Sequence, residues 1–437
     1  MEQLLALFRI PELRRRILIT FGLLLLYRLG FQIPLPGINL EVVKTAAEQR
    51  ISGGLAGLFG IMNAFTGAGI GSATLFSLGV MPYISASIIF SLLVKVVPAL
   101  EALSKEGGAG QKKISQYTRL ATIPICILQA IFVLYGVIRN PQFGLTTGST
   151  SILYSLSIIL SLTAGTMFIM WLGEKISEHG LGNGVSVIIM CGIISMIPTA
   201  VQQFLEMSEN AHQMAVTLSA IWIVTVLVVV YITRGQRRIP IQQAKLTRGR
   251  KVMGGSRHYL PLRVNQAGVM PIIFASALFI VPSVASGIPG LGWLQDVFGQ
   301  AGFMFMMAKI GLIFFFSFFW VRLMFQPEEI ANNLKEYGSF IPGIRPGKAT
   351  SAYLSFVLDR VTLAGSAFLA AIAVLPDLLT SNLNVHPTIG YFLGGTSILI
   401  VVGVALDVVD KLNSHLLMRN YEGFMKAGGS GWARRKG

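Results

Sequence analysis

The chain has 437 residues, of which 53% are hydrophobic and only 12% are charged, and its mean hydropathy is +0.67. This composition excludes an ordinary soluble protein and is typical of a chain that crosses a membrane several times. The formal net charge of +16 does not indicate a nucleic-acid-binding face, because the basic residues gather in a few segments between apolar spans.

Ten apolar spans follow one another along the chain, and each approaches the roughly 20 residues that cross a bilayer as a helix. They lie near residues 15–33, 74–94, 120–138, 151–172, 184–200, 215–233, 267–284, 307–325, 358–375 and 393–412. Arg14, Arg15 and Arg16 stand directly before the first long apolar stretch, and no small-residue cleavage site follows it, so we expect this helix to be retained. The predicted fold class is an all-α membrane protein with ten transmembrane helices.

The distribution of Lys and Arg predicts the orientation in the membrane. If the N-terminus is cytoplasmic, the outer side holds few of the 35 basic residues, namely Arg28, Lys44, Arg50, Arg139 and Lys309. Ten crossings then return the C-terminus to the cytoplasm, and anionic lipids of the inner leaflet attract the remaining basic residues. We therefore expect a multi-pass protein of the cell inner membrane with both termini cytoplasmic.

The segment from Ile51 to Val94 contains no Asp, Glu, Lys or Arg, and glycines divide it into two parts. The second part is the span at 74–94, but the first, Leu55 to Thr66, is too short to cross a bilayer. A short helix with flexible ends can enter a pore and leave it, since non-spanning backbone is tolerated at membrane depth inside protein or beside a water-filled cavity. The alternative is a helix that lies on the membrane surface.

The external segment near 201–214 divides the ten spans into two sets of five. The predicted N-terminal half covers residues 1–205, and the predicted C-terminal half covers residues 206–437. Because five is odd, two halves of similar fold must be inserted with opposite orientation. The count therefore predicts the inverted-repeat design of many transport proteins.

Three spans carry a face that is polar, then apolar, then polar again. Ser77, Val80, Ile84, Ser87 and Ser91 recur at intervals of three and four residues in the second span, so they share one helix face. Similar series are Thr396, Ile400, Gly403 and Asp407 in the last span, and Gln266, Ile273 and Ser276 in the seventh. Such faces would line two wet vestibules around an apolar constriction, although Ser and Thr also serve ordinary helix packing in membranes.

Two basic cytoplasmic segments, at 234–266 and 327–357, interrupt the second half. The first is far longer than a usual connection of about 4–6 residues. We find no apolar periodicity that would bury it, so we expect it to bind a partner and to contribute little to the fold. The alternative is a positively charged anchor without a partner.

No residue pattern predicts an enzyme, a cofactor or a metal site. The chain has no G-x-x-x-x-G-K-[ST] nucleotide loop, no G-x-S-x-G elbow and no His and Cys cluster. Cys126 and Cys191 lie inside spans, where we expect packed thiols and no disulfide. Charged residues near the predicted cytoplasmic helix ends are explained by pairing or snorkelling, and they are Glu174, Lys175, Arg322, Asp359, Arg360, Asp407 and Asp410.

Five segments in chain order carry a family resemblance. They read SLGVMPYISASIIFSLL, EKISEHGLGNGVSVII, LPLRVNQAGVMPIIFAS, GSFIPGIRPGKAT and YFLGGTSILIVVGVALD. Together they resemble the SecY family, the channel subunits of the bacterial Sec protein-secretion translocon. The resemblance implies two five-helix halves around an hourglass pore, with a ring of aliphatic side chains at its waist and a short plug helix on its outer side.

The resemblance also assigns residues to these parts. The implied pore ring consists of Val80, Ile84, Val185, Ile189, Ile273 and Ile400. The implied plug is the Leu55 to Thr66 helix, with Leu55, Leu58, Phe59, Ile61, Met62 and Phe65. The implied lateral gate toward lipid includes Ser85, Ser87, Gln129 and Val281.

The cytoplasmic basic residues are implied to bind the ribosome or a SecA-type motor ATPase. These residues are Lys245, Arg248, Arg250, Lys251 and Arg345. Arg can pair bidentately with phosphate or carboxylate, so an RNA surface and an acidic protein surface are both suitable. Further implied partners are a SecE-type subunit, a SecG-type subunit and the signal sequences of preproteins.

Two functions compete on this basis. The first is a protein-conducting channel that passes unfolded preproteins across the membrane and releases transmembrane segments laterally into lipid. The second is a secondary transporter of a small solute, built as a five-plus-five inverted repeat. A transporter needs ion-coupling groups at the midplane, where this sequence has aliphatic residues, so the sequence favours the channel.

Overall fold

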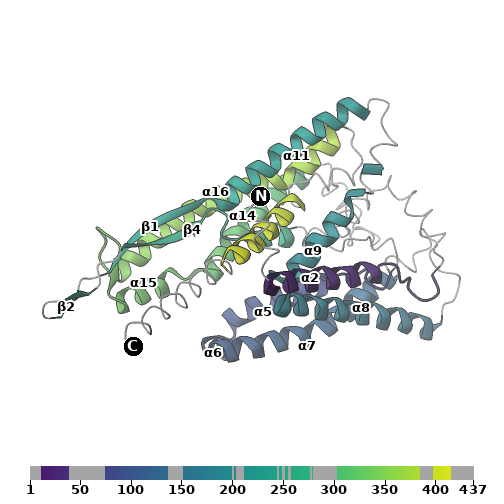
Figure 1. Ribbon diagram of the computed structural model, residues 1–437, viewed down its shortest axis with the longest axis horizontal. Helices are drawn as coiled ribbons and strands as arrows, with labels where there is room; N and C mark the ends of the chain where they lie inside the picture. Colours follow the sequence, from purple (N-terminus) through teal and green to yellow (C-terminus); the bar gives the residue numbers. More distant parts are fainter. Residues whose placement is uncertain are drawn as a thin grey trace, which may run out of the picture. The chain divides into compact units, whose positions relative to one another are not determined.

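The computed structural model describes residues 11–38, 74–135, 151–198, 201–202, 211–243, 246–248, 251–253, 257–275, 278, 303–383 and 397–414 (Figure 1). The described residues form two compact units. One unit contains those up to Pro198 together with those from Ile400 onward, and the other contains those between them.

The first unit is a bundle of helices. Its labelled helices are α2 (Pro11–Gly30), α5 (Met81–Val96), α6 (Pro98–Lys105), α7 (Gly108–Val133), α8 (Ile152–His179) and α9 (Gly184–Ser195), and the part from Ile400 onward of a further helix at 397–414 also belongs to it. Helix α8 packs against α2, α5, α7 and α9. It is therefore the central helix of this unit.

Small residues let other segments approach α8 closely. A Cβ atom on Gly165 would overlap the carbonyl oxygen of Leu75, and one on Gly184 would overlap the carbonyl oxygen of Gly173. Membrane helices gain little from hydrophobic burial against one another, so close packing through glycine is a main source of their association. These contacts fix the segment before α5 and the start of α9 against α8.

Helices α5 and α6 are bent by 97° at the break between them. Val97 has extended backbone angles, φ −96° and ψ 113°, as expected for a residue that precedes proline. Pro98 then begins α6 because its missing N–H costs nothing in a first helical turn. The second span therefore ends at Val96, and α6 runs in a new direction.

The second unit combines long helices with a small sheet. Its elements are α11 (Ala211–Arg234), β1 (Gln236–Gln243), β2 (Leu246–Arg248), β3 (Lys251–Met253), β4 (Arg257–Arg263), α14 (Phe303–Met324), α15 (Pro327–Glu336), β5 (Ser339–Phe340) and α16 (Lys348–Leu383). The strand order is β4-β1-β5, and β2 pairs with β3 in a separate two-stranded sheet. Figure 1 shows β1 and β4 running side by side as a ribbon that continues from α11.

The ribbon corrects the expectation for the basic segment at 234–266. Strands β1 and β4 pair antiparallel from Gln236 opposite Arg263 to Gln242 opposite Arg257. Ile239 and Leu262 are 1% and 0% exposed, and they pack in a core with Trp320 of α14 and residues of α16. The expectation that this segment has no apolar positions to bury is therefore wrong for the paired strands β1 and β4. The segment at 327–357 is likewise structured, as α15, β5 and the start of α16.

Five described helical segments are long and apolar enough to cross a membrane, and the bent pair α5 and α6 makes a sixth candidate. The five are Gly108–Val133, Ile152–His179, Val216–Arg234, Phe303–Glu336 and Lys348–Leu375. They overlap predicted spans, so the all-α membrane class is confirmed, with a β ribbon added to it. The total of ten crossings and the inverted repeat stay predictions.

Candidate functional site

The six predicted ring residues are described, and all are aliphatic. Five of them are at most 9% exposed, and Val185 is half-buried. The first unit holds Val80, Ile84, Val185, Ile189 and Ile400, and the second holds Ile273. Apolar side chains in water-poor surroundings are what a dewetted constriction requires.

The ring residues of α5 and α9 lie at the beginnings of these helices. Val80 is the N-cap residue of α5, and Ile84 donates its backbone N–H to the Val80 carbonyl at 3.0 Å. Val185 is the second residue of α9, and Ile189 follows about one turn later. Helix starts therefore position all four side chains.

The start of α9 is fixed by three local features. Gly182 has φ +82°, a conformation that glycine adopts without steric cost. The Asn183 side chain accepts a hydrogen bond from the Val185 N–H at 3.2 Å, as a helix N-cap does. The Ser177 hydroxyl of α8 accepts one from the Gly184 N–H at 2.8 Å. Val185 and Ile189 are thus placed by hydrogen bonds as well as by packing.

The segment before α5 corrects the predicted helical face of the second span. Residues 74–80 form turns, and α5 begins at Met81. The Thr74 N–H donates to the Ser77 hydroxyl at 2.8 Å, and this hydroxyl donates to the Thr74 carbonyl at 2.6 Å. Ser hydroxyls that bond nearby backbone compete with helix formation. Ser77 is therefore buried in a turn, and only Ile84, Ser87 and Ser91 of the predicted face belong to α5.

Aromatic packing holds the same segment. The Phe76 ring stacks on Tyr27 at 6.2 Å and on Phe168 at 6.0 Å between ring centroids. A Cβ atom on Gly30 would overlap this ring, so the end of α2 leaves room for it. The Leu75 N–H also donates to the Ile33 carbonyl at 2.9 Å. Val80 therefore follows a segment that is fixed to both α2 and α8.

The predicted gate residues fall on two neighbouring helices where they are described. Ser85 and Ser87 lie on α5 and Gln129 lies on α7, all three half-buried, and α5 packs against α7. Val281 lies outside the described residues, as do the six predicted plug residues.

Of the predicted partner-binding residues, Arg248 and Lys251 lie in the paired strands β2 and β3, here called the ribbon tip, and Arg345 lies in the segment before α16. Arg345 is exposed, and its carbonyl accepts a hydrogen bond from the Thr350 hydroxyl at 2.9 Å. Arg248 stands opposite Lys251 in the β2 and β3 pairing. Lys245 and Arg250 lie outside the described residues.

Charged residues near the helix ends are paired, as the sequence predicted for several of them. Arg119 Nε lies 2.5 Å from Glu174 Oε1 and links α7 to α8. Further pairs join Lys175 to Glu178, Arg322 to Asp359, and Lys411 to Asp407. Cys126 is a buried free thiol and Cys191 a half-buried one, which confirms that no disulfide joins them.

Sequence reasoning missed the Asn183 cap, the turn at 74–80 and the ribbon core. The cap has a local signal, since Asn before an apolar run is a common helix start. The ribbon core also has one, because Ile239 and Ile241, and Leu260 and Leu262, alternate with other residues as in half-buried strands.

These features define a polytopic α-helical membrane protein with aliphatic side chains at its helix starts and a basic ribbon outside the membrane-spanning helices. The family model for SecY matches residues 74–409, and the chain belongs to the SecY family. It is 41% identical to the protein translocase subunit SecY of Thermotoga maritima over 425 residues, with 96% of this chain and 97% of the relative covered. It is also 41% identical to that of Mycobacterium tuberculosis over 436 residues, with 96% and 98% covered.

Solved structures agree on the fold. One described as the structure of a protein conducting channel has a TM-score of 0.61 at 19% identity, with 92% of both chains covered. Sec61 in the canine ribosome-channel complex from the endoplasmic reticulum has a TM-score of 0.56 at 17% identity, again with 92% of both covered. At these identities the likeness concerns the fold alone.

Proposed function

We propose that the chain is the channel subunit of a protein translocase, which passes unfolded preproteins across the membrane and releases transmembrane segments laterally into lipid. The burial of aliphatic residues at the helix starts, in a member of the SecY family, is the observation that carries this proposal. An apolar waist excludes ions when empty, because filling it with water is unfavourable. Such a waist also presents no fixed charge that would bind a translocating polypeptide.

A solute transporter is less well supported. Coupling to an ion or proton gradient requires ionisable groups inside the membrane. In the described helices, acidic residues such as Glu174 and Asp359 lie near the predicted cytoplasmic ends and are paired with Arg119 and Arg322. Among the described residues, the six proposed ring positions are all aliphatic and supply no coupling group.

Three parts complete the proposed channel. Val80, Ile84, Val185, Ile189, Ile273 and Ile400 form its ring. The Leu55 to Thr66 segment is its plug. Ser85, Ser87, Gln129 and Val281 lie along its lateral gate, where small and polar residues reduce the dry interface that must separate.

The proposed partners follow from charge and location. The exposed Arg345 and the ribbon tip with Arg248 and Lys251 bind an anionic surface, which the ribosome or a SecA-type motor ATPase supplies. SecE-type and SecG-type subunits join within the membrane, signal sequences enter at the gate, and anionic lipids contact the cytoplasmic basic residues. We place the protein in the cell inner membrane with both termini cytoplasmic, and no enzymatic role is part of the proposal.

The decisive experiment is reconstitution of the purified complex in sealed vesicles with a SecA-type ATPase, ATP and a preprotein. We expect the preprotein to become protected from added protease only when its signal sequence is intact. Uptake of a small solute driven by an ion gradient, without preprotein protection, would instead support the transporter.

A further inference from the structure

A small cavity lies in the second unit, where the turn after β4 meets α14 and α16. Its volume is about 10 Å³, close to the roughly 10–15 Å³ that one buried water molecule requires on this measure. Its polar lining comes from Asn265 and Gln266 of the turn, Ser317 of α14, and Thr362 and Ser366 of α16. Five of its ten lining residues therefore carry polar side chains, and the other five are apolar residues or glycine.

The walls of the cavity are held in place. The Val264 N–H donates to the Gly235 carbonyl at 2.9 Å, and the Gln266 side chain accepts a hydrogen bond from the Arg263 N–H at 3.2 Å. A Cβ atom on Gly365 would overlap the Val264 carbonyl oxygen, so α16 already approaches the turn as closely as possible. The space cannot be closed by moving the turn toward α16.

The hydrogen bonds around the cavity are incomplete. Asn265 Oδ1 is buried and has no hydrogen-bond partner. The Ser317 hydroxyl donates to the Ile313 carbonyl at 2.7 Å, and the Ser366 hydroxyl donates to the Leu363 carbonyl at 3.0 Å. Both hydroxyl protons are thus used, so neither serine can donate to Asn265. A buried polar atom without a partner costs about 1–3 kcal/mol, and such atoms are rare in native proteins.

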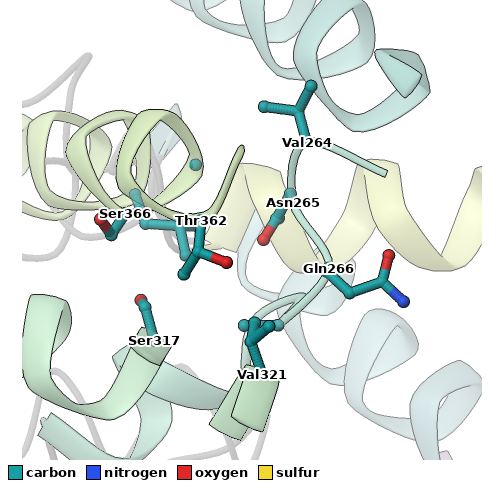
Figure 2. A pocket seen from close by; sticks show the side chains of 10 residues that line it. Val264, Asn265, Gln266, Ser317, Val321, Thr362 and Ser366 are labelled. Atoms are coloured by element: carbon teal, nitrogen blue, oxygen red, sulfur yellow. The ribbon is translucent and has the colours of Figure 1, made fainter. Parts of the chain in front are cut away.

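The orientation of the side chains suits a bridging molecule. Figure 2 shows the oxygen atoms of Asn265 and Thr362 turned toward one another, while the amide of Gln266 points away. Asn265 Oδ1 does not hydrogen bond to this hydroxyl directly. The terminal torsion of an Asn side chain is broad, so a small rotation of the Asn265 amide is inexpensive.

We propose that one water molecule occupies this cavity and joins the turn at 264–267 to α14 and α16. Its protons are donated to Asn265 Oδ1 and to the free lone pairs of the Ser317 hydroxyl, and its oxygen accepts the Thr362 hydroxyl proton. Water fits because it donates and accepts at once, and two to four polar partners are usual for a buried water. This site goes beyond the channel function and does not depend on it.

The test is a structure of the purified complex, by cryo-electron microscopy or crystallography, at a resolution that shows ordered water. We expect one peak of density within hydrogen-bond distance of Asn265 Oδ1 and the Thr362 hydroxyl. Thr362→Val removes the donor without changing the shape, and we expect the peak to disappear and the melting temperature to fall. Thr362→Ser keeps the hydroxyl and should keep the peak.

The matched control is Thr225→Val in α11. Thr225 is also buried, but its hydroxyl donates to the Ile221 carbonyl of its own helix at 2.8 Å. We expect a smaller fall in melting temperature from Thr225→Val than from Thr362→Val. An empty cavity in the wild-type density, or equal melting temperatures for the two valine variants, would overturn the proposal. If the Thr362→Val complex fails to assemble, the wild-type and Thr362→Ser structures still test the proposal. The water peak must be present in both.

Discussion

Gly184 of α9 lies so close to Gly173 of α8 that a Cβ atom on Gly184 would overlap the Gly173 carbonyl oxygen. The two helices therefore meet through backbone at the point where Val185 begins the proposed ring segment of α9. Any side chain at Gly184 must push the start of α9 away from α8, so this contact links helix packing to the placement of Val185 and Ile189.

Gly184→Ala should destabilise the protein by about 1–3 kcal/mol, as overpacking of a close contact does. The measurement is thermal unfolding of the purified complex. Gly22→Ala is the matched control, because Gly22 lies in α2 with no atom near its Cβ position, and alanine favours a helix by up to about 1 kcal/mol over glycine. Equal stability of the two variants would show that the Gly184 contact is not tight.

Ile84→Asn and Ile189→Asn should each increase ion leakage through the resting channel, because a polar side chain lowers the cost of filling the waist with water. They should also allow export of preproteins with defective signal sequences. Conductance in planar bilayers and an export assay measure these effects. Ile89→Asn is the control on the same helix, since Ile89 is exposed and should leave leakage unchanged. Leakage from Ile89→Asn but not from Ile84→Asn would contradict the ring assignment.

Arg345→Glu should reduce preprotein translocation and stimulation of the motor ATPase, since it reverses a charge at the proposed contact with an anionic partner. The loss should amount to a few kcal/mol of binding free energy at most. Assays in vesicles that contain equal amounts of complex provide the comparison. Lys348→Glu makes the same change of charge at an exposed position and should have the smaller effect. Normal translocation by Arg345→Glu would exclude a coupling role.

Ile239→Ala should destabilise the second unit by about 2–5 kcal/mol, as large-to-small changes in a core do. Ile239 is buried beside Leu262 and Trp320, so its loss leaves a cavity between the ribbon and α14. Limited proteolysis of the ribbon and thermal unfolding would detect the change. Arg237→Ala, at an exposed position of the same strand, should leave stability nearly unchanged. A stable Ile239→Ala variant would mean that the ribbon folds independently of the helices.

The sequence by itself determined the membrane class, the course of several spans and the pairing of end charges. These properties follow from composition and from the spacing of residues along a single helix. Both can be read without knowing which distant segments pack together. Glu174 could be expected to find a partner because an unpaired charge near a membrane is costly. The same reasoning identified Cys126 as a packed thiol. The family resemblance supplied the ring residues, of which all six are described and apolar.

The tertiary structure decided where α5 starts, how the ribbon is anchored and where hydrogen bonds stay incomplete. Ser77 fits a helical period, but its bonds to Thr74 and the packing of Phe76 against Tyr27 and Phe168 hold the segment as a turn. Ile239 gains its burial from Trp320, far along the chain. Asn265 Oδ1 is buried without a partner in the turn where α16 approaches the Val264 carbonyl through Gly365. Each of these outcomes depends on contacts between distant residues, which no local pattern contains.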